Sequence, residues 1–300
     1  MGVARVPATA GRVGGRASLW RRYARSGAGV AAVAFLALLV CAALAGPLVY
    51  PRSPVEINLA QAQRPPGRDF PLGTDENGRD VLARALQGAR TTLLVGTAAM
   101  AVAVGFGTLV GLVAGFYGGR VDEALMRATD IIMAVPSFFL ALTILTLFGT
   151  SVPNIVLVIG MTSWMNVARL VRGEVLRVRG LEFVEAARAS GGSDARILLS
   201  HVLPQTTSAI TVASTIGVAW AILVESALSY LGLGVQPPTS TWGNMLTNSQ
   251  NYFNTAPWLV MVPGFLISLT VLSANLAGDA LRDALDPRSA RRIGEMTNVG

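Results

Sequence analysis

Residues 169–204 read RLVRGEVLRVRGLEFVEAARASGGSDARILLSHVLP and form a charged stretch between long apolar segments. Within it, residues 182–190 are rich in good helix formers, and the Gly191-Gly192 pair ends the predicted helix, as glycine does just beyond a helix C-terminus. Ala186 and Ala187 are small enough to let another protein surface approach the backbone closely. Pro204 cannot extend a preceding helix and marks the start of the next one.

The rest of the chain is strongly apolar. Of its 300 residues, 52% are hydrophobic and only 14% are charged, and the apolar residues gather in runs about long enough to cross a bilayer, which takes ~20 residues. This composition is far from that of a soluble domain and predicts an all-α membrane protein. We expect six transmembrane helices, at residues 28–50, 91–116, 131–148, 154–168, 206–230 and 258–278.

The polar segments between these helices define the domain organisation. We expect an N-terminal tail at 1–27, an extracytoplasmic segment at 51–90, a core of five transmembrane helices at 91–280 and a C-terminal tail at 281–300. The extracytoplasmic segment contains a short helix at 81–87. The core contains a short connection at 117–130 and the 169–204 loop. Ala43-Leu44-Ala45 resembles a signal-peptidase site, which leaves cleavage as an alternative. The apolar run around it is longer than that of a signal peptide, so an uncleaved helix is favoured.

The distribution of arginine predicts the orientation. Six arginines precede the first helix, residues 231–257 contain none, and residues 281–300 contain four. Because basic loops stay in the cytoplasm, we expect both termini and the 169–204 loop on the cytoplasmic side. The 51–90 segment, with six arginines against five acids, runs against this pattern, but the rule weakens for longer loops.

The basic residues also limit the chemistry of the chain. The net charge is +7 and the sequence contains no lysine, so a phosphate-binding P-loop, which needs its lysine, is excluded. Cys41 is the single cysteine, which excludes a disulfide or a cysteine-based metal site within one chain. No hydrolytic triad, carboxylate pair or His/Cys cluster is apparent, so we expect no catalytic residues and no metal site.

A few residues outside the charged loop are candidates for a specific role. Gly107, Gly111 and Gly115 recur every four residues and predict a face against which a neighbouring helix packs. Glu225 is an acid inside an apolar run, for which a pathway or gate residue and a simple hydrogen-bonding residue both remain open. His201 is interpreted as a helix-end or interface residue rather than a proton relay. The acidic run from Asp75 to Asp80 lacks the terminal glutamate of a calcium loop and is interpreted as a capped turn.

The charged loop resembles the EAA loop of ABC-transporter permeases, in which Glu-Ala-Ala is followed at fixed distances by Gly and by Leu-Pro. Glu185-Ala186-Ala187, Gly191 and Leu203-Pro204 match these spacings, while His201 stands where the pattern has isoleucine. Flanking motifs are similar to those of the second (C-type) permease of dipeptide, oligopeptide and nickel importers: Pro71–Asp75, Gly78–Asp80, Leu231–Gly234, Asn275-Leu276 and Asp286–Arg288. The resemblance covers residues 71–288.

This resemblance implies a type I ABC importer permease fold, in a bacterial or archaeal inner membrane, that provides half of a translocation pathway. Glu185 and Ala186-Ala187 would contact an ATPase subunit, Gly191 would make the bend, and Leu203-Pro204 would join the loop to the fifth helix. The implied partners are a homologous permease that forms a heterodimer with this chain, two ATPase subunits that hold ATP and magnesium, and an extracytoplasmic substrate-binding protein, with no nucleic acid. Peptide is the favoured substrate, and nickel or another small solute remains open.

Two other function classes fit less well. An ion-coupled secondary transporter is expected to contain several buried ionisable residues and an internal repeat, which the sequence does not display. A structural membrane scaffold does not explain the spacing from Glu185 to Pro204. Association with a separate ATPase subunit discriminates among these classes.

Overall fold

The computed structural model describes residues 16–285, and this part of the chain is helical, with a single isolated β-bridge between Thr74 and Asp80. The helices are α1 (Arg16–Tyr23), α2 (Gly27–Val49), α3 (Val81–Tyr117), α4 (Gly119–Met133), α5 (Ser137–Phe148), α6 (Val152–Arg179), α7 (Glu182–Ala189), α8 (Asp194–Ile197), α9 (Leu203–Tyr230), α10 (Trp242–Met245) and α11 (Trp258–Leu285). A π-helical turn, Leu198–Val202, joins α8 to α9, and short 3₁₀ turns occupy Leu59–Gln61 and Ser249–Tyr252.

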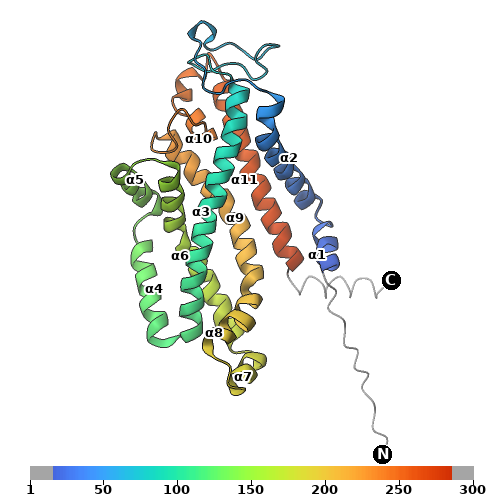
Figure 1. Ribbon diagram of the computed structural model, residues 1–300, viewed down its shortest axis with the longest axis vertical. Helices are drawn as coiled ribbons and strands as arrows, with labels where there is room; N and C mark the ends of the chain where they lie inside the picture. Colours follow the sequence, from blue (N-terminus) through green and yellow to red (C-terminus); the bar gives the residue numbers. More distant parts are fainter. Residues whose placement is uncertain (1–15, 286–300) are drawn as a thin grey trace, which may run out of the picture.

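Four long helices, α3, α6, α9 and α11, run lengthwise beside one another (Figure 1). Helix α2 packs along α11 on one flank, while α4 and α5 lie beside α6 on the other. Helices α7 and α8 lie at one end of the bundle, which we call the α7 end. The irregular 51–80 segment and α10 lie at the opposite end, which we call the α10 end.

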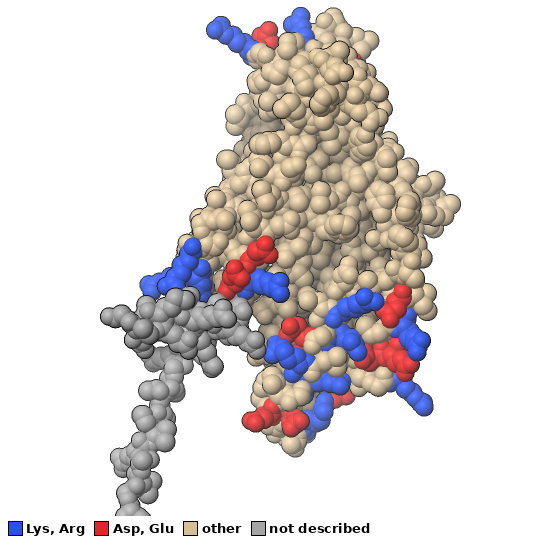
Figure 2. Space-filling model, turned by 180° about the vertical axis from the view of Figure 1, so that it is seen from behind, with Lys and Arg blue, Asp and Glu red and all other residues tan. Residues whose placement is uncertain are grey.

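The lengths and hydropathy of these helices confirm the predicted class of all-α membrane protein. In the described part of the chain, residues 16–285, five spans are long and apolar enough to cross a bilayer: α2, α3, α6, the continuous Asp194–Tyr230 segment and α11. Helices α4 and α5 qualify together as a sixth span. Figure 2 shows a broad band without charged side chains, with the charges gathered mostly toward the α7 end.

The predicted third helix at 131–148 is wrong as a single element. Helices α4 and α5 are bent by 77° at a short break that contains Pro136. Proline lacks a backbone N–H and disfavours helical backbone in the residue before it, so the chain turns here and restarts at Ser137. The predicted 117–130 connection is in fact mostly α4.

The predicted second helix also needs correction. It begins at Val81 rather than at residue 91, and the short helix expected at 81–87 is its first two turns, in a single helix of 37 residues. Asp80 starts this helix because its carboxylate accepts a hydrogen bond from the Ala83 N–H at 3.0 Å. Gly88 lies inside the helix without ending it, and the irregular segment therefore ends at residue 80.

The 169–204 stretch is mostly helical rather than a loop. The fourth helix, predicted to end at residue 168, continues as α6 to Arg179, and Gly173 lies inside it without ending it. The fifth helix begins at Leu203, and the sixth continues past residue 278 to Leu285 with Pro263 inside it. The Asp286–Arg288 motif and most of both predicted tails lie outside the described residues.

Candidate functional site

Helix α7 is held by its apolar side on the end of the bundle. Val184 is fully buried and belongs to the same apolar cluster as Val178 of α6, Ile197 of α8 and Val202 of the π-helical turn. A short helix is marginal by itself in water, so this packing is what stabilises α7. Its opposite side is exposed, with Glu185 and Ala186 at the surface.

The two alanines of the Glu-Ala-Ala motif lie in different environments. Ala186 is exposed, whereas Ala187 is half-buried and packs against the apolar cluster of its own chain. Ala186 is therefore the more accessible of the two alanines, and the expectation that both offer a surface to another protein stays a prediction. The helical period separates neighbouring residues by about 100°, which turns Ala187 inward.

Gly191 ends α7 in the left-handed region, with φ of +79°. Its N–H donates to the Arg188 carbonyl at 3.0 Å, and the Gly192 N–H donates to the Ala187 carbonyl at 3.1 Å. These bonds satisfy two carbonyls at the helix end, and a side chain at residue 191 would strain the backbone. The bend predicted at Gly191 is thus a feature of its backbone conformation.

Two arginines tie the α7 end together. The Arg188 guanidinium lies over the Phe116 ring, with its carbon 5.7 Å from the ring centroid. Arg179 Nη1 donates to the Gly115 carbonyl at 2.7 Å and to the Phe116 carbonyl at 3.3 Å, which satisfies the C-terminal end of α3. Helices α3, α6 and α7 therefore meet at one point.

The glycine face predicted on α3 packs against α6 of the same chain. A Cβ atom at Gly107 would lie 2.6 Å from the Trp164 carbonyl oxygen, one at Gly111 would lie 2.5 Å from the Ala168 oxygen, and one at Gly115 would lie 2.7 Å from Val175 Cβ. Gly160 of α6 is equally close to Val102 of α3, at 2.7 Å. Only glycine allows this approach, which makes α3 and α6 a close pair along most of their length.

Ion pairs attach α4 to α6. Arg172 binds Asp122 through two parallel hydrogen bonds of 2.5 and 2.6 Å, and Arg169 pairs with Asp130 at 2.5 Å. The two-pronged arrangement fixes the orientation of the two helices as well as their distance. The charges of the 169–179 part of the stretch therefore serve the contact between α4 and α6.

The chain between α7 and α9 contains the other predicted loop residues. His201 lies half-buried in the π-helical turn, with its ring 6.5 Å from that of Phe183. Leu203 is half-buried against the apolar cluster and Pro204 is exposed in the first turn of α9. A π-helical turn is a rare irregularity found mostly at functional positions, and here it connects α7 and α8 to a membrane helix.

Glu225 is completely buried, with an exposed fraction of 0%, near the α10 end of α9. Ser229 Oγ donates to Glu225 Oε1 at 2.7 Å, whereas Oε2 has no partner among the described residues. Glu225 is thus held by a hydrogen bond inside the bundle of its own chain, and its role as a pathway or gate residue stays a prediction.

The acidic run at 75–80 is occupied by interactions of its own. Asp75 accepts hydrogen bonds from the backbone N–H groups of Asn77 and Arg79, both at 2.9 Å, and pairs with the side chains of Arg79 and Arg84. With its carboxylate engaged in this way, Asp75 holds a capped turn in place.

Two family models match this chain. The model described as "Binding-protein-dependent transport system inner membrane component" matches residues 107–291, which include the close α3–α6 pair, α7 and α9. The model described as "N-terminal TM domain of oligopeptide transport permease C" matches residues 16–66. The chain belongs to the family of binding-protein-dependent transport system inner membrane components.

Several permeases are similar to this one over most of their length. The dipeptide transport system permease protein DppC of Alkalihalophilus pseudofirmus is 42% identical, over 82% of this chain and 81% of its own. The oligopeptide permease OppC of Haemophilus influenzae is 37% identical over 90% of this chain and 89% of its own. The di/tripeptide permease DppC of Pseudomonas aeruginosa is 39% identical over 90% of this chain and 91% of its own length. These matches confirm the predicted resemblance to C-type ABC permeases and the type I permease fold.

Sequence reasoning missed several residues that build this site in the permease. Val184 and Phe116 resemble other apolar residues, and Arg179 and Arg188 were only counted as positive charges. Their contacts join segments up to 72 residues apart along the chain, as Arg188 and Phe116 show. No local pattern reports such a contact.

Proposed function

We propose that this permease forms half of the translocation pathway of an ATP-driven importer of short peptides and has no ATPase site of its own. The observation that carries the proposal is α7, which exposes Glu185 and Ala186 while its other side is fixed on α3, α6 and the π-helical turn. Such a helix is a rigid projection that a separate ATPase subunit can grip and move.

The proposed coupling follows from these contacts. Closure of the ATPase subunits around ATP and magnesium displaces α7. Because Arg188 and Arg179 connect this region to the end of α3, and the glycine face joins α3 to α6, the displacement moves the α3–α6 pair as one body. Tilting of this body opens the pathway to alternate sides of the membrane.

The proposed orientation puts the α7 end and both termini in the cytoplasm. The concentration of charged side chains at this end supports it, since basic residues favour the cytoplasmic side. The α10 end then faces a substrate-binding protein outside the membrane. The other half of the pathway would come from a homologous permease, in a heterodimer, with two ATPase subunits below.

Short peptides are the proposed substrate. The three relatives described above are named as dipeptide, oligopeptide and di/tripeptide permeases, and none of these three carries a nickel name, which supports peptide over the nickel alternative.

Reconstitution tests the proposal. The permease is assembled in proteoliposomes with its partner permease, ATPase subunits and substrate-binding protein, and uptake of radiolabelled tripeptide and of nickel is measured with and without ATP. We expect ATP-dependent uptake of the peptide only. Uptake without ATPase subunits, driven by an ion gradient, would instead identify a secondary transporter, and ATP-driven uptake of nickel alone would overturn the peptide assignment.

A further inference from the structure

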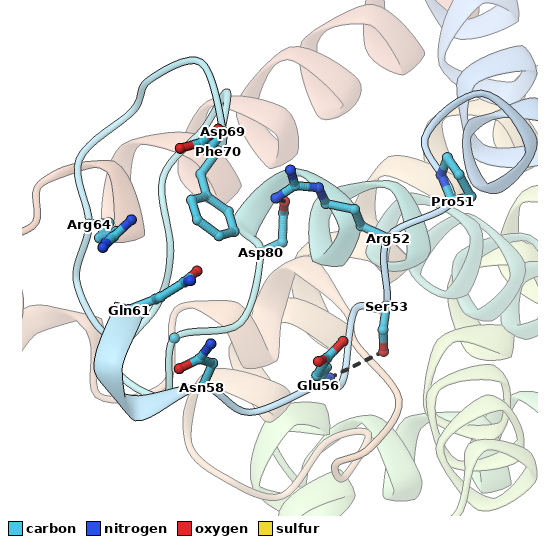
Figure 3. A pocket seen from close by; sticks show the side chains of 11 residues that line it. Pro51, Arg52, Ser53, Glu56, Asn58, Gln61, Arg64, Asp69, Phe70 and Asp80 are labelled. Atoms are coloured by element: carbon cyan, nitrogen blue, oxygen red, sulfur yellow. Dashed lines mark hydrogen bonds and ion pairs between the residues drawn. The ribbon is translucent and has the colours of Figure 1, made fainter.

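A pocket of about 600 Å³ opens at the α10 end, in the irregular segment between α2 and α3 (Figure 3). It is lined by Pro51, Arg52, Ser53, Glu56, Asn58, Gln61, Arg64, Asp69, Phe70, Gly78 and Asp80, and we call it the outer pocket. Its size falls within the usual ~300–1,000 Å³ of small-molecule sites.

The outer pocket is preformed, although regular secondary structure is nearly absent from its walls. The Asn58 N–H donates to the Asn77 carbonyl at 3.0 Å, and the Thr74 N–H donates to the Arg64 carbonyl at 3.0 Å, which joins the two arms of the segment. Gly78, with φ of +73°, lies so close to the other arm that a Cβ atom would be 1.8 Å from the Asn58 oxygen. These contacts keep the walls in place without a ligand.

The charges of one wall satisfy one another. The Arg52 guanidinium lies over the Phe70 ring, 4.8 Å from its centroid, and its Nη1 is 3.6 Å from Asp80 Oδ2. Asp80 is only 4% exposed and also accepts a hydrogen bond of 2.5 Å from the Tyr50 hydroxyl. This wall offers a ligand an aromatic surface and a neutralised ion pair.

The remaining polar side chains have unused binding capacity. Glu56, Asn58, Gln61 and Arg64 make no side-chain hydrogen bond or ion pair within residues 16–285. In Figure 3, Gln61 and Arg64 lie on one side of the outer pocket and Glu56 on the other. With Asp69, which also makes no side-chain hydrogen bond or ion pair within residues 16–285, the pocket therefore presents two free carboxylates, two amides and a free guanidinium.

We propose that the outer pocket binds short peptides with free termini. Glu56 pairs with the N-terminal ammonium group, Arg64 pairs with the C-terminal carboxylate, and the amides of Asn58 and Gln61 bond to the peptide backbone between them. This inference rests on the proposed peptide import and adds a site at which the permease itself holds a peptide on the outer side.

The charges of the outer pocket favour such a ligand over simple ions. Once Arg52 is paired with Asp80, Glu56 and Asp69 remain as acids and Arg64 as a base. An inorganic anion would meet the two acids, and a metal cation would leave Arg64 unpaired. A zwitterionic short peptide matches both signs.

The test uses the complete importer in lipid nanodiscs without its substrate-binding protein, and saturation-transfer NMR with the peptide Ala-Ala-Ala. We expect millimolar binding by the wild type, weakened roughly three- to fivefold in Glu56→Gln and in Arg64→Gln, the size of one exposed ion pair. N-acetylated peptide should bind Glu56→Gln as well as it binds the wild type, and C-amidated peptide should do the same with Arg64→Gln. Arg68→Gln, an exposed neighbour that does not line the outer pocket, is the control.

Two results would overturn the inference: no binding by the wild type, or unchanged binding in both variants. If the variants then lose affinity for the substrate-binding protein when it is added back, the outer pocket is a docking surface. ATP-driven uptake of Ala-Ala-Ala by the wild type importer separates this inference from the proposed function. If the importer takes up the peptide but the outer pocket does not bind it, only the inference is refuted. If the importer does not take up the peptide, the proposed function is refuted.

Discussion

Arg188 rests on the ring of Phe116, its guanidinium carbon 5.7 Å from the ring centroid, and this contact links the exposed helix α7 to the end of α3. Arg188 is exposed although Phe116 is buried, and a cation–π contact of such a solvent-exposed guanidinium contributes about 0.5–1 kcal/mol, which is too little to hold the fold but enough to bias the position of one short helix. The contact is therefore suited to transmitting motion.

Replacing Arg188 by alanine should weaken coupling while leaving the permease folded. We expect a severalfold lower ratio of peptide uptake to ATP hydrolysis in the reconstituted importer, because α7 can then move without α3. Arg127→Ala serves as the control, since Arg127 is exposed on α4 and, within residues 16–285, pairs only with Glu123 one turn earlier on the same helix. Equal ratios in Arg188→Ala and wild type would show that the contact transmits nothing.

Gly191→Val should abolish uptake with the protein still inserted in the membrane. The left-handed φ of +79° excludes a β-branched residue, so the chain after α7 must change direction. Gly191→Asn is the matched variant, because asparagine tolerates this conformation, and it should retain most of the uptake. Ser193→Ala, just beyond the bend, should also be mild. If the valine and asparagine variants transport alike, the conformation of residue 191 does not matter for coupling.

Gly111→Ala should destabilise the permease itself rather than its assembly with other subunits. The added Cβ would lie 2.5 Å from the Ala168 carbonyl oxygen, and overpacking of this kind costs about 1–3 kcal/mol. Gly105→Ala on the same helix is a sharp control, since nothing lies within 4 Å of its Cβ position and alanine is the better helix former. Thermal unfolding of the isolated permease in detergent should show a lower Tm for Gly111→Ala and an unchanged or higher Tm for Gly105→Ala.

Tyr50 should contribute stability that disappears at high pH. Burial, followed by the hydrogen bond to Asp80, raises the pKa of Tyr50 to about 12 from 10.0. Because the folded pKa lies above the unfolded one, the contribution is complete below pH 10 and is lost as the pH rises toward 12. Tyr50→Phe should thus be less stable than wild type at pH 8, with the difference shrinking between pH 10 and 12. Tyr117→Phe, at an exposed tyrosine outside this hydrogen bond, should show no such trend.

Cysteine labelling in a Cys41→Ala background tests the orientation. Asn254 and Ser193 are both exposed, at the α10 and α7 ends respectively. We expect a membrane-impermeant maleimide added to intact cells to label Asn254→Cys but not Ser193→Cys. Labelling of Ser193→Cys from outside would invert the orientation and remove α7 from the side where ATP is.

The class of fold and the family were readable from the sequence because both depend on local features. An apolar run of bilayer length must be a helix, since its backbone polar groups have no other partners in lipid. The spacing from Glu185 to Gly191 and Pro204 lies within one stretch, and a glycine that ends a helix acts through its own φ. These properties can be predicted without knowing which residues pack beside them.

The tertiary structure alone showed that α6 continues to Arg179 and what each side chain touches. The charged residues 169–179 were predicted to lie in a loop, yet they are helical, and two of them, Arg169 and Arg172, pair with Asp130 and Asp122 of α4. Ala187 packs against the apolar cluster, and the Gly107–Gly115 face packs against α6 of the same chain. The sequence does not distinguish these contacts from others, because several helices could offer an equivalent partner. The outer pocket likewise exists only because the Asn58 and Asn77 backbones, 19 residues apart, meet and hold its walls in place.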